Sequence, residues 1–266
     1  MIMRLHPRNG LRAFVGVVLG LLTAISSPHA EPRSAVPILV YHSLGPRAVD
    51  GMTVTTTVFE ENIAWLKAHG YRIIPLRRLI DALRDPGQPL PEHAVVITAD
   101  DGRRSVYTEM LPIIRREQIP VTLFIYPSAI SNADYALTWD ELAEIAKTGL
   151  VEIESHTYWH PNFQHEAARL SAADYQAFVM RQLTLSRQVL RQRLGGTVDM
   201  LAWPFGIHDP QLEQWAKDAG YQAAFTIERA GAARGEDLLA LPRFLMTNLD
   251  RGARFAALIE NTEPLQ

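Results

Sequence analysis

Two carboxylates stand side by side at the end of an apolar run. Residues 95–99, Val-Val-Ile-Thr-Ala, lead directly to Asp100 and Asp101, and Gly102 follows. Side chains alternate along a strand, so the two acids are expected to diverge, with one free to hold a metal ion and the other to move a proton. Taken alone, the same residues also fit an Asp-Asp-Gly turn that closes a strand.

Two histidines form the second candidate. His156 directly follows the apolar run 150–155, and His160 comes four residues later. On a single turn of helix, imidazoles at this spacing face the same way, as a two-histidine metal site requires. A third ligand from a carboxylate would leave positions open for water and substrate, which is the arrangement of a hydrolytic divalent metal. A surface or helix-capping pair fits the histidines alone, and the Asp-Asp pair favours the metal.

The elements that must position these groups repeat as strand followed by helix. Apolar runs predict strands over residues 36–41, 71–76, 95–97, 121–126, 150–155, 200–203, 223–227 and 239–245. Helical periodicity occupies residues 57–68, 79–84, 106–117, 139–147, 172–194, a segment capped by Asp209, and 255–259, with an interruption expected at Pro112. Repeated βα units predict an α/β fold, a distorted (β/α)7-8 barrel in a single domain over residues 31–266, in preference to an open parallel sheet.

Further polar and aromatic residues follow other predicted strands. His42 comes after residues 36–41, Trp203 and Phe205 close residues 200–203, and Arg243 lies within residues 239–245. Since working residues of such barrels gather at the carboxyl ends of the strands, all four are candidates for one site. Trp203 and Phe205 would stack on a sugar ring or simply pack. His42 and Arg243 would act beside Asp100, or be an ordinary loop histidine and a surface arginine.

Composition limits the partners of this chain. Its 266 residues carry a net charge of −3, with 47% apolar and 21% charged residues. Residues 1–30 hold Arg4, Arg8 and Arg12 and no acid, so the remainder has 23 basic and 29 acidic residues. That balance argues against a nucleic-acid partner. The absence of cysteine excludes disulfides, thiolate metal sites and cysteine nucleophiles.

The first thirty residues predict export. Three arginines precede an apolar run over residues 13–25, and small residues follow it up to Ala30. This pattern is typical of a secretory signal peptide, and the run is shorter than the ~20 residues that span a bilayer. Residues 1–30 are therefore expected to be a signal peptide or an uncleaved N-terminal anchor, with a periplasmic or extracellular location for the rest. Membrane association would run through residues 13–25.

These motifs resemble those of the polysaccharide deacetylase (NodB-type) family. The stretch 98–102, Thr-Ala-Asp-Asp-Gly, is similar to the family's Thr-Phe-Asp-Asp-Gly, and 156–160, His-Thr-Tyr-Trp-His, matches its His-Ser/Thr-x-x-His. The resemblance implies a metal-dependent carbohydrate deacetylase on a distorted barrel. It implies Asp100 as general base, with Asp101, His156 and His160 as ligands of one divalent ion, zinc first and cobalt or nickel as alternatives.

Two departures point to a subgroup. Residues 202–205, Ala-Trp-Pro-Phe, lack the arginine of the family's Arg-x-Pro-Tyr/Phe motif, and no late Leu-x-His supplies a general acid. Deacetylases of poly-β-1,6-N-acetylglucosamine have an aromatic-Pro-Tyr-Gly stretch and an acid histidine after the first strand. Residues 40–42, 89–91 and 150–157 also resemble that subgroup. The resemblance implies His42 as general acid and Arg243 as a substitute for the missing arginine.

The expected activity is removal of N-acetyl groups from an N-acetylhexosamine polysaccharide, by hydrolysis of a linear amide C–N bond. Other substrates remain open, among them peptidoglycan, a chitin-like oligomer or an O-acetylated glycan. An inactive relative that binds glycan during polysaccharide export is the alternative of a different class. Ala99 and Arg103, where the family usually has other residues, leave it open, while the intact Asp100, Asp101, His156 and His160 argue against it.

Overall fold

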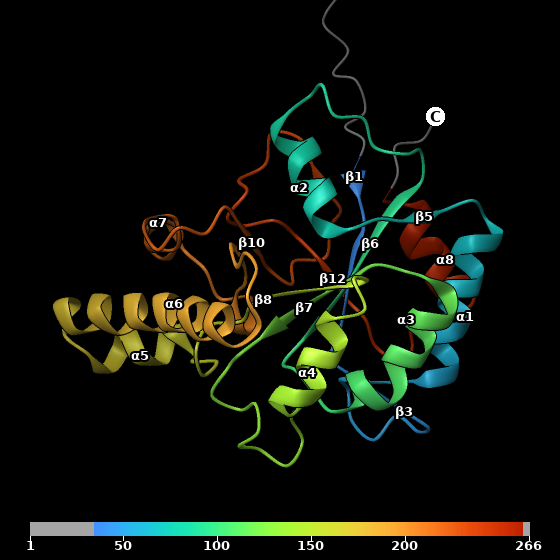
Figure 1. Ribbon diagram of the computed structural model, residues 1–266. Helices are drawn as coiled ribbons and strands as arrows, with labels where there is room; N and C mark the ends of the chain where they lie inside the picture. Colours follow the sequence, from blue (N-terminus) through green and yellow to red (C-terminus); the bar gives the residue numbers. More distant parts are fainter. Residues whose placement is uncertain (1–34, 263–266) are drawn as a thin grey trace, which may run out of the picture. The chain divides into compact units, whose positions relative to one another are not determined.

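A parallel sheet runs through the centre of the computed structural model, which describes residues 35–262 (Figure 1). It has eight strands in the order β10-β9-β8-β7-β6-β2-β12, with β5 paired to β6 beside this path. The strands are β2 (Ile38–Tyr41), β5 (Arg72–Ile73), β6 (Ala94–Asp100), β7 (Val121–Ile125), β8 (Val151–Ser155), β9 (Met200–Ala202), β10 (Ala223–Phe225) and β12 (Phe244–Leu245). Along the chain, β2 is the first strand of this sheet and β12 the last, and these two pair with each other. The strand order is therefore that of a barrel.

The barrel is incomplete between β10 and β12. A single isolated bridge, from Phe225 to Leu241, joins β10 to the residues that lead into β12. The predicted strand 239–245 is therefore too long, because Pro242 has no N–H to contribute to a ladder. The structure confirms the predicted α/β fold and distorted barrel in a single domain, as a curled parallel sheet with an open seam.

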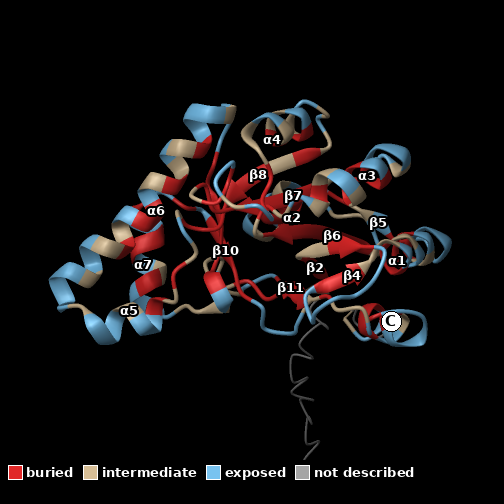
Figure 2. Ribbon diagram, turned by 90° about the horizontal axis from the view of Figure 1, so that it is seen from below, coloured by how far each residue is buried: buried red, intermediate tan, exposed pale blue. Residues whose placement is uncertain are grey.

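Helices cover the outside of this sheet. They are α1 (Thr56–Ala68), α2 (Leu76–Arg84), α3 (Leu111–Glu117), α4 (Trp139–Ala146), α5 (Phe163–Arg169), α6 (Ala172–Leu194), α7 (Pro210–Asp218) and α8 (Ala253–Glu260). The strands are buried while the outer faces of the helices are exposed (Figure 2). This two-sided burial explains why the strands read as continuous apolar runs.

The starts of α2 and α3 differ from the boundaries predicted from the sequence. A π-helical turn, η1 (Val106–Met110), precedes α3, and this is the interruption that Pro112 predicted. The helix predicted over residues 79–84 begins earlier, at Leu76, and β5 ends at Ile73. Pro75 explains both, since it cannot donate to a strand ladder but is accepted at a helix start.

Short elements frame the carboxyl end of the barrel. β3 (Ser43–Gly45) pairs in parallel with β4 (Thr53–Thr55), directly after β2. A 3-10 turn, η2 (Pro204–Gly206), follows β9. At the opposite, amino end of the strands, β1 (Ala35–Val36) leads into β2 and pairs antiparallel with β11 (Ala232–Ala233). The sequence predicted a loop where β3 lies.

The predicted signal peptide or anchor, residues 1–30, lies outside the described residues. Within residues 35–262, no helix has the length and apolar character that crossing a membrane requires.

Candidate metal and catalytic site

The two adjacent carboxylates at the end of β6 have different surroundings. Asp100 is the last residue of the strand and is 2% exposed. Asp101 follows with φ of 74°, in the left-handed region that non-glycine residues seldom adopt. Both still reach one imidazole, since His156 Nε2 lies 3.9 Å from Asp100 Oδ2 and 3.7 Å from Asp101 Oδ1.

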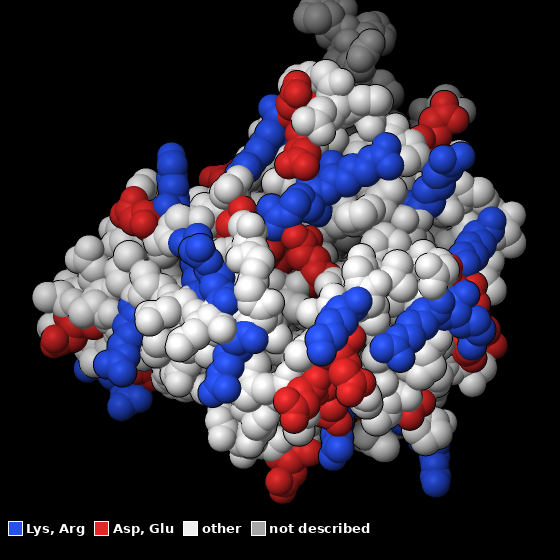
Figure 3. Space-filling model, viewed as in Figure 1, with Lys and Arg blue, Asp and Glu red and all other residues white. Residues whose placement is uncertain are grey.

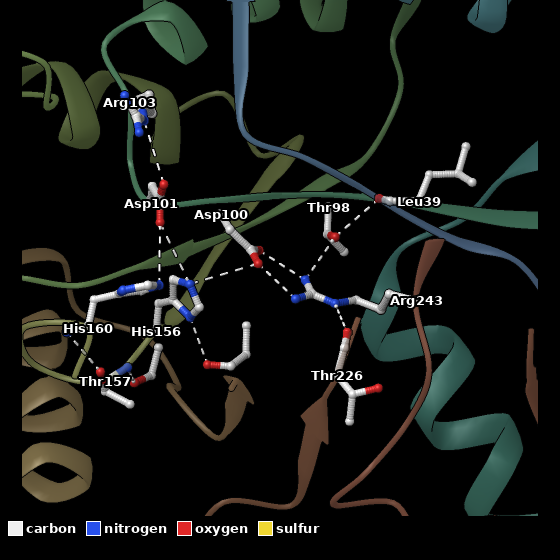
Figure 4. Close-up of polar contacts among 12 residues, drawn as sticks. Leu39, Thr98, Asp100, Asp101, Arg103, His156, Thr157, His160, Thr226 and Arg243 are labelled. Atoms are coloured by element: carbon white, nitrogen blue, oxygen red, sulfur yellow. Dashed lines mark hydrogen bonds and ion pairs between the residues drawn. The ribbon is translucent and has the colours of Figure 1, made fainter. Parts of the chain in front are cut away.

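Asp101, His156 and His160 converge into one candidate metal site (Figure 4). One ligand atom from each lies within 4.8 Å of the others. His160 Nε2 is 3.8 Å from Asp101 Oδ1, the same oxygen that His156 approaches. Two imidazole nitrogens and one carboxylate oxygen around a common point are the donor set of a hydrolytic zinc-type site.

The histidines meet without the helical turn that their spacing predicted. Residues 156–162 form bends and irregular backbone, and α5 begins only at Phe163. Thr157 and His160 have φ of 64° and 62°, and the His160 N–H donates to Thr157 Oγ1 at 3.1 Å. The predicted proximity of the imidazoles is correct, while the predicted geometry is wrong. Two left-handed residues, rather than a helix, turn the second ring back toward the first.

A backbone contact fixes the orientation of the His156 ring. Its Nδ1 lies 2.7 Å from the carbonyl oxygen of Ala202, which can only accept, so Nδ1 carries the proton and Nε2 keeps its lone pair. Burial, opposed by the charge of Asp100, lowers the pKa of His156 to about 4. Burial and the nearby His156 likewise lower the pKa of His160 to about 4. Both rings are neutral at pH 7, as ligands must be, so these residues fit a divalent ion.

Asp100 is held from the opposite side by Arg243. Two parallel hydrogen bonds join the guanidinium to the carboxylate, Nη1 to Oδ1 at 2.9 Å and Nη2 to Oδ2 at 2.7 Å. Arg243 Nε also donates to the carbonyl oxygen of Thr226, the residue after β10, so the side chain lies across the seam of the barrel. Burial acts to raise the pKa of Asp100, but the charges of Arg243 and His156 outweigh it and lower that pKa to about 2.

This geometry corrects the assignment of Arg243 as a substrate-binding residue. Its side chain is 0% exposed and packs near the rings of Phe124 and Phe225. A sugar cannot reach it. Arg243 does lie beside Asp100, as the sequence predicted, and its contact there orients the Asp100 carboxylate.

His42 lies directly after β2, at the same end of the barrel. Its Nδ1 is buried and has no hydrogen-bond partner among the described residues. It is close enough to Asp100 and His156 to shift the pKa of both by its charge. An ordinary loop histidine would be bonded to the backbone, so this placement is compatible with the predicted general acid.

The two aromatic candidates, Trp203 and Phe205, differ in their exposure to solvent. Trp203 is 1% exposed, and its indole N–H donates to the carbonyl oxygen of Leu239, so it packs in the core and the expectation of sugar stacking is wrong for it. Phe205 is 57% exposed, and its ring centroid lies 4.6 Å from that of His160. Phe205 therefore stays a candidate for contact with substrate.

Three residues beside the site were not singled out as site residues from the sequence. Arg103 Nε lies 3.5 Å from Asp101 Oδ2, and its guanidinium lies 5.0 Å from the centroid of the Tyr135 ring. The hydroxyls of Tyr135 and Tyr126 are 2.6 Å apart, and the Tyr126 ring lies 5.4 Å from that of His160. The place of Arg103 directly after Gly102 was the only signal available.

Sequence relatives bear out the resemblance. A poly-beta-1,6-N-acetyl-D-glucosamine N-deacetylase of Escherichia coli (strain K12) is 28% identical over 253 residues, covering 82% of this chain and 37% of that protein. The chain thus spans little more than a third of that relative. A protein of the same name from Staphylococcus aureus (strain MRSA252) is 25% identical over 214 residues, covering 79% of this chain and 73% of that one.

Solved structures share the fold. A Streptococcus pyogenes deacetylase, PplD, has a TM-score of 0.76 at 20% identity and covers 87% of this chain and 100% of its own. IcaB from Ammonifex degensii has a TM-score of 0.74 at 22% identity, covering 85% of this chain and 97% of its own. Residues 87–224 match the family model for polysaccharide deacetylase, a span that runs from before β6 into β10 and contains both motifs. The chain therefore belongs to the polysaccharide deacetylase family.

Proposed function

We propose that this chain is a metal-dependent hydrolase that removes N-acetyl groups from an N-acetylhexosamine polysaccharide outside the cytoplasm. The observation that carries the proposal is the convergence of Asp101, His156 and His160 next to a separate, ionised Asp100. A general base adjacent to a two-histidine, one-carboxylate site supplies both parts that amide hydrolysis by water needs.

Asp101, His156 and His160 would hold the divalent ion, zinc first and cobalt or nickel as alternatives. A divalent ion bound there would lower the pKa of a coordinated water and polarise the acetyl carbonyl. The hydrogen bond from His156 Nδ1 to Ala202 supports this assignment because it leaves Nε2 available.

The chain's own side chains would move the protons. Asp100 is ionised at neutral pH and takes a proton from the attacking water, and Arg243 fixes the orientation of its carboxylate. The water's oxygen bonds to the acetyl carbon, the bond from that carbon to nitrogen breaks, and acetate leaves. His42 donates the proton that the departing amine requires, which its free Nδ1 and its nearness to Asp100 support.

The substrate class rests on the relatives and on charge. Matched proteins from two organisms carry the name poly-beta-1,6-N-acetyl-D-glucosamine N-deacetylase, which favours a polymer of N-acetylglucosamine. Basic and acidic side chains are interspersed over the face in Figure 3, without a field of one sign that would suit nucleic acid. The basic start and the apolar run 13–25 favour action outside the cytoplasm, with those residues as signal or anchor.

Release of free amines tests this function directly. Purified protein, metal-free or loaded with Zn²⁺, Co²⁺ or Ni²⁺, is incubated with oligomers of β-1,6-linked N-acetylglucosamine, chitin, peptidoglycan fragments and an O-acetylated glycan. Amine release from the β-1,6 oligomer that depends on the metal is the expected result. Acetate release from the O-acetylated glycan alone would reassign the substrate.

Two variants separate the roles of the site residues. Asp100→Asn is expected to abolish amine release while metal binding, measured by calorimetry, is retained. His156→Ala is expected to lose both. If the native chain binds none of the three metals, the proposed mechanism is wrong.

A further inference from the structure

A cavity of about 300 Å³ is connected to the candidate metal site through Arg103, which lines it and pairs with Asp101 Oδ2, whereas both histidines approach Oδ1. Its walls come from the β3–β4 segment, from Arg103 and Ser105 after β6, and from Tyr135. Two arginines, Arg47 and Arg103, line it together with one acid, Asp50. The site described above uses none of these side chains except through the ion pair from Arg103 to Asp101.

The backbone at Arg103 is fixed by its neighbours. Gly102 accepts a hydrogen bond from the N–H of Leu137 at 2.9 Å, and Arg104 donates to the carbonyl of Tyr135 at 2.8 Å. Arg103 itself bridges Ala136 in antiparallel fashion. The backbone after the two carboxylates is thus hydrogen-bonded to residues 135–137, and these bonds restrain the backbone from which the Arg103 side chain extends.

The guanidinium is also held by its own contacts. One edge faces Asp101, with Nε 3.5 Å from Oδ2, a distance of an ion pair rather than a hydrogen bond. One face lies over the ring of Tyr135, whose hydroxyl contacts that of Tyr126. Such stacking fixes the plane of the guanidinium while leaving its outer N–H groups to other partners.

Those outer donors have no acceptor within residues 35–262. The side chain of Arg103 is 34% exposed, its Nε is buried without a hydrogen-bond partner, and it donates no hydrogen bond to any residue of this range. Asp50 also lines the cavity but accepts no hydrogen bond from Arg103, and its Oδ1 accepts from Thr53 Oγ1 at 2.7 Å and from the Met52 N–H at 3.0 Å. The positive charge of Arg103 nonetheless contributes to lowering the pKa of Asp50, so the two lie close together.

We propose that this cavity is a substrate subsite for a carboxylate carried by the sugar next to the one that loses its acetyl group. The inference rests on the proposed deacetylase function and extends its substrates from the neutral N-acetylglucosamine polymer to polymers whose neighbouring sugar carries an acidic substituent, such as a uronate. A planar guanidinium whose Nη groups donate no hydrogen bond within the described residues can pair with a planar carboxylate. Arg47 adds a second positive charge, so the lining has one net positive charge from its three ionised groups.

The test compares substrates that differ in charge at the neighbouring sugar. Values of kcat/KM are measured on the zinc-loaded full chain for a neutral β-1,6-linked N-acetylglucosamine tetramer and for a tetramer that alternates N-acetylglucosamine with glucuronate. Arg103→Gln is expected to lower kcat/KM for the uronate tetramer about tenfold more than for the neutral one. A tenfold difference is what the loss of one hydrogen-bonded charge pair would cause. Added salt should reduce the native chain's preference for the uronate tetramer, because a half-exposed pair is screened.

A matched control lies one residue away. Arg104 pairs with Glu141 at 3.1 Å and is 58% exposed, so Arg104→Gln removes the same charge without touching the cavity. The ratio of the two kcat/KM values is expected to stay at the native value in Arg104→Gln. Equal losses on both tetramers in Arg103→Gln would show that Arg103 acts only by positioning Asp101, and would overturn the subsite.

A binding measurement keeps the inference separate from the proposed function. Calorimetry with the uronate tetramer is run on the native chain and on Arg103→Gln, and needs no turnover. Binding that is lost in Arg103→Gln supports the subsite even if no acetyl group is released from any substrate. Binding that is equal in the two proteins refutes the subsite even if the chain proves to be an active deacetylase.

Discussion

Removal of the Arg243 guanidinium is the sharpest test of how the site is built. Arg243 and Asp100 are 0% and 2% exposed, and two hydrogen bonds join them. Arg243→Met would leave a buried carboxylate without its partner. Breaking a buried ion pair in this way costs about 3–5 kcal/mol of unfolding free energy, out of about 5–15 kcal/mol for a typical domain. At about 2–4 °C per kcal/mol for a domain of this size, the melting temperature should fall by roughly 6–20 °C.

The same substitution should reverse the pH dependence that Asp100 contributes. In the native chain its pKa of about 2 lies below the ordinary 3.8, so its stabilisation, about 2 kcal/mol, is present above that ordinary value and lost as pH falls toward 2. Without Arg243, burial remains as the cause that raises this pKa. The Asp100 contribution in Arg243→Met is then present at low pH and lost as pH rises through the raised pKa.

Urea unfolding between pH 3 and pH 7, with chelator present to remove any metal contribution, measures both effects. The double variant Arg243→Met with Asp100→Asn is expected to recover part of the loss, since no unpaired charge remains. Arg116→Met, at an ion pair whose arginine is 56% exposed, is the control and should leave the melting temperature unchanged. If Arg243→Met were as stable as the native chain, or if the double variant were less stable than Arg243→Met, the buried ion pair between Arg243 and Asp100 would not have the stabilising role argued above.

Three further predictions concern the mouth of the barrel. His42→Gln should reduce hydrolysis of an N-acetyl amide by about 10²–10⁴-fold but barely affect p-nitrophenyl acetate, whose leaving group needs no proton; equal losses would contradict the acid role. Gly102→Ala should destabilise the chain in urea by about 1–3 kcal/mol through its φ of 71° and a Cβ only 2.9 Å from Ile125 Cδ1. Gly149→Ala has a similar φ of 69° and open space, so a cost as large as that of Gly102→Ala would mean that the Ile125 contact contributes nothing. Phe205→Ala should raise KM for the polymer and leave kcat nearly unchanged, and a fall in kcat alone would place the ring in the chemistry instead.

The central elements were predictable because their patterns are local. Residues 95–97 are fully buried on both faces of the sheet, which is why they appear as an uninterrupted apolar run. The chemistry at 100–102 and 156–160 then follows from where such strands end. Pro112 correctly predicted the interruption before α3. The effects of Pro75 and Pro242 were missed: β5 ends before Pro75 and β12 begins only after Pro242, so both strands are shorter than their apolar runs suggest.

What the sequence could not give is the pairing of distant side chains and the direction of single ones. Arg243 and Asp100 are separated by 143 positions, and only the closing of β12 against β2 brings them together. Trp203 and Phe205 are two residues apart and would share a face of a regular strand, but Phe205 adopts φ of 57° in η2 and turns outward. Left-handed residues at Thr157 and His160 are equally invisible to periodicity.

The missing motif arginine has a structural explanation. The expected arginine position is occupied by Ala202, which lies at the end of β9 and whose carbonyl accepts the His156 Nδ1 proton. The guanidinium that Asp100 needs arrives instead from the seam beyond β10, on Arg243. Among the described residues, Arg243 pairs with Asp100 and makes no hydrogen bond or ion pair with the neighbouring Asp101.

Asp101 pairs instead with Arg103, whose side chain is partly exposed. The two arginines differ in how closely they contact their carboxylates. Arg243 holds both oxygens of Asp100 at hydrogen-bond distance in the core, whereas Arg103 approaches one oxygen of Asp101 at 3.5 Å and is 34% exposed. A rigid carboxylate suits a base that must aim at one water, and a loosely paired carboxylate can adjust its distance when an ion binds. The difference in burial between the two arginines supports the proposed division of roles, with Asp100 as base and Asp101 as metal ligand.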